Sequence, residues 1–76
     1  MNAYELIEAE RHRQIELGWS EEHDKMHDVG HFALLIEKQL NDLKKAWYES
    51  EPGEMHHRLV TIGAIAVAAL EARTNG

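Results

Sequence analysis

The feature that most constrains the fold is an apolar run near the C-terminal end of the chain. Residues 59–70 read LVTIGAIAVAAL, in which Thr61 carries the only hydroxyl and no side chain is charged. A helix that is apolar all round has to be buried on several sides, and one partner helix cannot cover it. We therefore expect this helix at the centre of a bundle, and we expect chains to associate so that its remaining faces are buried.

The short length of the chain also favours association. With 76 residues it has room for a single domain, residues 1–76, and a domain of this size buries only about 60–65% of its unfolded surface. The sequence contains no cysteine, so neither a disulfide nor a thiolate zinc site can add stability. Stability has to come from packing within the chain or against a partner.

Three helices are predicted, over residues 3–17, 28–48 and 54–73, because apolar residues recur there with helical spacing. Asn2 and Glu5 have the spacing of a capping box, and Gly18 is placed to close the first helix. Asp28 is a suitable N-cap for the second helix, and Pro52 suits the first turn of the third. The predicted fold class is all-α, a three-helix chain that assembles into an oligomeric helical bundle.

The second helix has the clearest apolar pattern. Two columns repeat at seven-residue intervals, one made of Val29, Ile36 and Leu43 and the other of Ala33, Leu40 and Trp47. This spacing is typical of a seam in antiparallel helix packing. The first helix has a thin apolar face, which suits a lid or a partner-binding arm.

The charge balance excludes some partners. Fourteen acidic and eight basic residues give a net charge of −6, which repels phosphate backbones and argues against direct nucleic-acid binding. An acidic surface suits a basic protein face. The chain begins without a signal-peptide pattern and has no apolar stretch of roughly 20 residues, so we expect a cytoplasmic protein without membrane contact.

The linker between the first two predicted helices is rich in metal-binding side chains. His23, His27 and His31 stand at four-residue intervals with Asp24 and Asp28 between them. On a helix, His23, Asp24 and His27 could bind zinc or a similar divalent cation. The alternative is that these side chains cap the start of the second helix.

A second polar motif lies at the end of the first helix. Arg11 and Arg13 could grip a phosphate or carboxylate with Gln14 beside them, and Trp19 could stack a base. In the alternative, Trp19 packs against the end of the bundle. The arginines then pair with acidic neighbours on the helix surface, namely Glu8, Glu10 or Glu16.

Three segments, ERHRQIELGWSEEHDKMH at 10–27, HFALLIEKQL at 31–40 and HRLVTIGAIAVAALEAR at 57–73, resemble a family of small phage and prophage proteins. That family has an ERxRQ helix, a GW and EHDxxH linker, an amphipathic helix and a last helix of the type RxLVxxxALxxAxIER. The layout is also distantly similar to the MazG-like all-α nucleoside triphosphate pyrophosphohydrolases, in which carboxylates on two neighbouring helices hold magnesium.

The MazG-like resemblance implies a site that has lost most of its carboxylates. Glu37 keeps one of them, whereas Lys38, Asn41, Arg58 and Thr61 stand at the places of the others. Magnesium needs several oxygen ligands, so the resemblance implies a binder rather than an active hydrolase, with no catalytic residue retained. The alternative for these positions is a solvated face with pairs four residues apart.

The sequence favours a non-catalytic, phage-encoded helical homo-oligomer that binds a host protein or a nucleotide-type signal, with counter-defence as one role implied by the phage resemblance. The candidate binding residues are Arg11, Arg13, Gln14, Trp19, His23, Asp24, His27 and Glu37. One alternative is a divalent-metal-dependent nucleotide pyrophosphohydrolase that uses Glu37 with the linker residues. The other is an acidic mimic of nucleic acid. No cofactor is predicted apart from the divalent cation.

Overall fold

The computed structural model describes residues 1–17 and 29–74, which form three helices: α1 over Ala3–Glu16, α3 over Val29–Tyr48 and α4 over Pro52–Thr74. The described residues contain no strand, so the all-α prediction is confirmed. The predicted helices begin and end within two residues of the observed ones.

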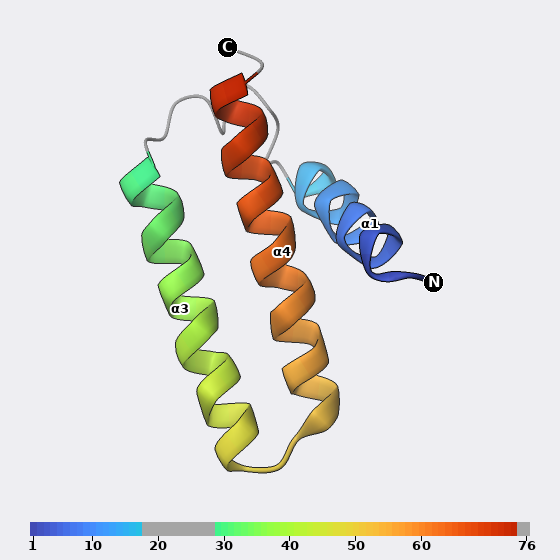
Figure 1. The fold of residues 1–76 in the computed structure, drawn as a ribbon, viewed down its shortest axis with the longest axis vertical. Helices are drawn as coiled ribbons and strands as arrows, with labels where there is room; N and C mark the ends of the chain where they lie inside the picture. The colour runs from blue at the N-terminus through green and yellow to red at the C-terminus, as the bar shows by residue number, and fades with distance from the viewer. Residues whose placement is uncertain (18–28, 75–76) are drawn as a thin grey trace.

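The longest helix, α4, lies in the middle of the molecule. α3 runs antiparallel along one flank of α4, and α1 crosses the opposite flank at an angle (Figure 1). The molecule measures 40 × 28 × 19 Å along its principal axes. The apolar run of α4 is therefore covered on two sides by helices of its own chain.

The core lies between α3 and α4. Phe32, Ile65 and Ala68 are buried together. Half-buried side chains pack around them, namely Leu35, Ile36, Ala69 and Ala72. Phe32 and Ile65 fill the space between the two helices. Near the other end of α3, Ala46 is only 2% exposed, and its small side chain lets α3 and α4 lie close together.

This packing corrects the predicted seam on α3. Ile36 and Leu43 of the first column are half-buried, but in the second column Ala33 is exposed and Trp47 is 70% exposed. The contact face includes Phe32 and Ala46 instead, so it is rotated away from the second column. That column lies on the flank of α3.

α1 packs on α4 through a close contact at Gly63. A Cβ atom at this position would lie 2.8 Å from Ile7 Cδ1, so the glycine lets the two helices approach. At the start of α1, Asn2 Oδ1 accepts a hydrogen bond from Glu5 N–H at 2.9 Å, and Glu5 Oε1 accepts one from Asn2 N–H at 3.2 Å. The predicted capping box is confirmed, whereas Gly18 and Asp28 lie outside the described residues.

The turn between α3 and α4 is a Schellman motif. Glu51 N–H donates to the Ala46 carbonyl at 2.9 Å, and Ser50 N–H donates to the Trp47 carbonyl at 3.2 Å. Ser50 has a φ of 56°, the left-handed conformation that this motif requires and that usually falls to glycine. Pro52 then occupies the first turn of α4, as predicted.

Candidate functional site

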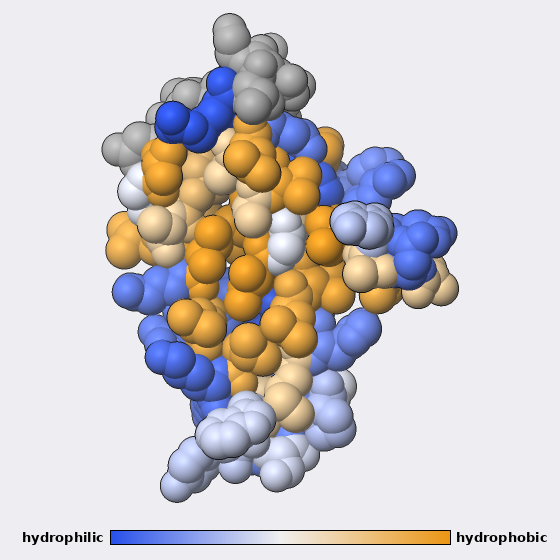
Figure 2. Space-filling view, in the orientation of Figure 1, coloured by the Kyte–Doolittle hydropathy of each residue, from blue (hydrophilic) through white to orange (hydrophobic). Residues whose placement is uncertain are grey.

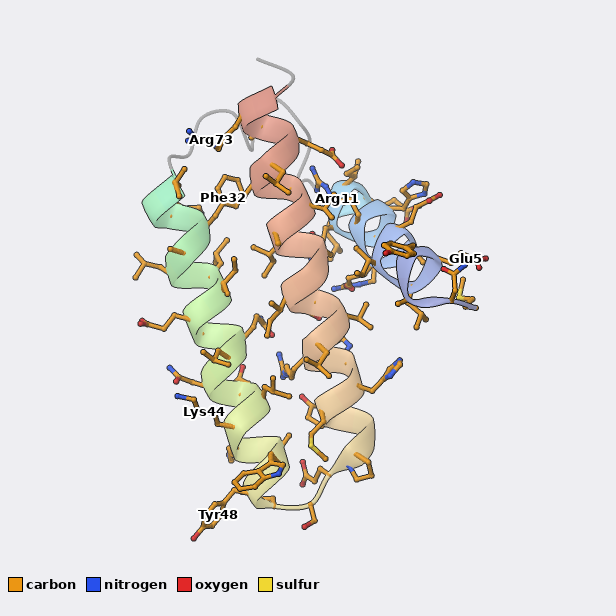
Figure 3. The ribbon with its side chains drawn as sticks, viewed as in Figure 1. Glu5, Arg11, Phe32, Lys44, Tyr48 and Arg73 are labelled. Atoms are coloured by element: carbon orange, nitrogen blue, oxygen red, sulfur yellow. The ribbon has the colours of Figure 1, made fainter. Side chains whose placement is uncertain are left out.

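The ERxRQ motif on α1 is turned inward. Glu10 is 7% exposed, and Arg11 and Gln14 are each 4% exposed. Together with Ile7 they occupy one helical face, since residues three, four and seven apart lie above one another. Three polar side chains of α1 are therefore buried, and Arg11 points from α1 towards α4 (Figure 3).

The two arginines of the motif lie on different sides of α1. Arg13 Nε donates to Glu10 Oε1 at 2.6 Å and to Oε2 at 3.0 Å. This hydrogen bond raises the pKa of Arg13 above its ordinary value. Arg11 Nε lies 4.0 Å from Glu71 Oε2 on α4. Arg13 thus makes the local ion pair of the alternative interpretation, and a cradle that used both arginines would require Arg13 to leave Glu10.

Gln14 is the third buried member of the motif. Its Oε1 atom accepts no hydrogen bond within the described part of the chain. Burying an amide oxygen without a donor costs about 1–3 kcal/mol. The burial of Gln14 therefore has a polar cost that the contact of α1 with the rest of the molecule must offset.

Of the remaining predicted site residues, the structure describes only Glu37, and Glu37 does not lie beside the arginines. Trp19, His23, Asp24 and His27 lie outside the described residues. Glu37 is exposed on α3, which packs on the other flank of α4 from α1 (Figure 1). Over residues 1–17 and 29–74, no three histidine, aspartate or glutamate side chains lie close enough to hold a metal ion.

Two of the positions singled out by the MazG-like resemblance, Arg58 and Thr61, make contacts within the helix pair. Arg58 Nη1 donates to Gln39 Oε1 at 2.8 Å, and Arg58 Nε donates to Glu54 Oε1 at 2.6 Å. Arg58 Nη1 also lies 3.5 Å from Asp42 Oδ2 on α3. Thr61 Oγ1 donates to a carbonyl of its own helix, that of His57, at 2.9 Å. Arg58 thereby ties α4 to α3.

Asp42 belongs to the same network. Lys38 Nζ donates to Asp42 Oδ2 at 2.8 Å, and this hydrogen bond, supported by the charges of Lys38 and Arg58, lowers the pKa of Asp42 below its ordinary value. Lys38 with Asp42 and Glu54 with Arg58 are both pairs four residues apart. These pairs match the alternative interpretation of a charged helix surface.

The third face of α4 is open and apolar. Figure 2 shows hydrophobic side chains gathered over α3 and α4 on the side towards the viewer. We call this surface the open face and, from their helical spacing, assign to it exposed or half-buried apolar residues, namely Val29, Ala33, Ile36 and Leu40 on α3 and Leu59, Ile62, Ala66 and Leu70 on α4. On each helix these positions recur at intervals of three or four residues, so they form a stripe.

Several side chains of the open face are well exposed. Leu59 is 58% exposed, Leu70 62%, Val29 49% and Leu40 41%. Within the described ranges, no helix is both long and apolar enough to cross a membrane. The open face adds an exposed apolar surface to a chain with a net charge of −6.

A cavity of about 440 Å³ lies between α1 and α4. Ile7 and Ile15 from α1 and Val67 from α4 supply its apolar wall, and Glu8 and Glu71 are acidic side chains that line it. Arg11 also lines the cavity. The sequence analysis did not predict this cavity, because no local motif marks it. The one signal in the sequence is that Ile7, Glu8 and Ile15 have the spacing of residues on one side of a helix.

No protein-family model, no curated protein and no solved structure matches the chain. Its function is therefore inferred from the residues and their geometry.

Proposed function

We propose that the protein is a non-catalytic helical binding protein that acts as a homodimer, in which the open faces of two copies cover each other. The observation that carries this proposal is the continuous apolar surface over α3 and α4 (Figure 2). Monomeric soluble proteins rarely expose large contiguous apolar patches, and such patches mark interaction sites.

A second copy suits this surface because the surface is formed by an antiparallel helix pair. Two such pairs with apolar inner faces pack into a four-helix bundle. A two-fold symmetric contact uses the same patch on both partners. The residues assigned to the open face are apolar, so a contact through them limits the repulsion between two chains that each have a net charge of −6.

In this proposal the dimer acts in the cytoplasm by binding a second, different protein. The net charge favours a basic partner surface, and α1, on the flank of the hairpin (Figure 1), stays accessible when the open face is covered. The resemblance to phage proteins supports a host protein as that partner and counter-defence as the role of the dimer.

The dimer is tested by sedimentation velocity on paired leucine variants of α3. Leu40 lies on the open face, whereas Leu34 is 67% exposed on another side of the same helix. We expect a wild-type dimer at micromolar concentration, a monomer for Leu40→Lys and a dimer for Leu34→Lys. Ala66→Glu on α4 should also give monomers, because it buries an unpaired charge in the interface. A folded wild-type monomer, or equal behaviour of the two lysine variants, would overturn the proposal.

The non-catalytic role is tested by incubation with magnesium or manganese and a panel of nucleoside triphosphates. We expect no pyrophosphate above background, because a magnesium site for phosphoryl transfer needs several oxygen ligands. Turnover that Glu37→Gln abolishes without loss of helical structure would establish the pyrophosphohydrolase alternative instead.

A further inference from the structure

We infer that the cavity between α1 and α4 accepts a lysine or arginine side chain from a basic partner protein. This inference rests on the proposed function, because it names the kind of partner and the place where the partner binds. It concerns a different surface from the open face, so the two can be tested separately.

The size and walls of the cavity suit a long basic side chain. Its volume of about 440 Å³ falls in the range of about 300–1,000 Å³ that is usual for ligand pockets. Ile7, Ile15 and Val67 offer apolar contacts, and the methylene stem of a lysine or arginine packs on such surfaces while its charged head stays near water.

The charges that line the cavity favour a cation. Glu8 is exposed on α1, and the Glu71 side chain is 40% exposed on α4, so two carboxylates from two helices are accessible to an incoming head group. The side chain of Arg11 is only 5% exposed and faces Glu71. Glu71 therefore offsets the charge of Arg11, and Glu8 remains to attract a basic group. His12 and Tyr4 complete the lining of the cavity.

The same charges disfavour an anion in the cavity. To reach the Arg11 guanidinium, a phosphate would have to pass two carboxylates and compete with Glu71 for a side chain that is almost fully buried. The net charge of −6 adds a long-range repulsion. A nucleotide-type ligand at this cavity is the competing outcome that the experiment must distinguish.

The experiment compares two probes with the same alkyl chain and opposite charge. Hexylammonium and hexyl phosphate are titrated into the full-length protein while the methyl signals of Ile7, Ile15 and Val67 are followed by NMR. We expect saturable shifts of these methyl groups with hexylammonium, and binding at least about fivefold weaker with hexyl phosphate. Tighter binding of hexyl phosphate, or no shift of these signals with either probe, would overturn the inference.

Two glutamate-to-glutamine variants test which carboxylate attracts hexylammonium. Glu8→Gln should weaken hexylammonium binding about two- to fivefold, the range of an exposed ion pair. Glu16→Gln, an exposed position on the same helix that does not line the cavity, should leave the binding unchanged. Equal effects of the two variants would reject a specific role of Glu8.

Sedimentation of the same samples separates this inference from the proposed function. A dimer that does not bind hexylammonium rejects the cavity inference alone. A monomer that binds hexylammonium rejects the dimer alone.

Discussion

Replacing Gly63 with alanine should loosen α1 from α4. A Cβ atom at this position would lie 2.8 Å from Ile7 Cδ1 and 3.0 Å from Ile7 Cγ1, both closer than ordinary van der Waals contact. The β-branched side chain of Ile7 is stiff at χ1, so α1 has to move away or Ile7 has to leave its preferred rotamer.

Two effects of opposite sign set the size of the change. Overpacking of this kind costs about 1–3 kcal/mol, whereas alanine is favoured over glycine inside a helix by about 1 kcal/mol. The net effect of Gly63→Ala is therefore a destabilisation of about 0–2 kcal/mol. Gly53 provides the control, because nothing lies within 4 Å of a Cβ atom built there and Gly53→Ala should only add helix propensity.

The assay is urea unfolding of both variants and the wild type at one protein concentration, followed by circular dichroism. The free energy of unfolding of Gly53→Ala should exceed that of Gly63→Ala by about 1–3 kcal/mol. Adding Ile7→Val removes Cδ1, the atom of closest approach, and should recover most of the loss in Gly63→Ala. If Gly63→Ala stabilises the protein as much as Gly53→Ala does, α1 does not pack on α4 at this glycine and the reasoning is refuted.

Three further predictions concern the α3–α4 hairpin. Ser50→Gly should raise the free energy of unfolding by about 0.5–1 kcal/mol, because the left-handed penalty of serine exceeds the extra chain entropy of glycine; a lower melting temperature would contradict this. The lowered pKa of Asp42 means that its stabilising contribution is present above its ordinary pKa of 3.8 and is lost as the pH falls through the lower folded value. An NMR titration should therefore give Asp42 a midpoint below 3.8 that Lys38→Gln raises, and an unchanged midpoint would count against the hydrogen bond. Arg58→Met should cost about 1–3 kcal/mol in thermal unfolding, because the side-chain oxygen of Gln39 and the carboxylate of Glu54 lose their donor; an unchanged melting temperature would show that this network adds nothing.

The sequence by itself determined the three helices and how α1 and α4 begin. Asn2 and Glu5 form their capping box within one helical turn, Pro52 lies in the first turn of α4, and the apolar run marks the central helix. Each of these features depends on residues three or four positions apart, or on the conformation of a single residue. Such local effects act in the same way wherever the rest of the chain lies.

Only the tertiary structure decided which faces meet. Gly63 lies within the apolar run of α4, but its contact with Ile7 of the same chain depends on how α1 crosses α4. The burial of Arg11 and Gln14, and the cavity that joins Ile15 to Val67, follow from that same crossing. Polar residues at the end of α1 have the composition of a solvated surface, and no local rule turns them inward. Arg11 and Gln14 are buried because they lie on the same face of α1 as Ile7. The contact with α4 that buries Ile7 therefore buries these two polar side chains as well.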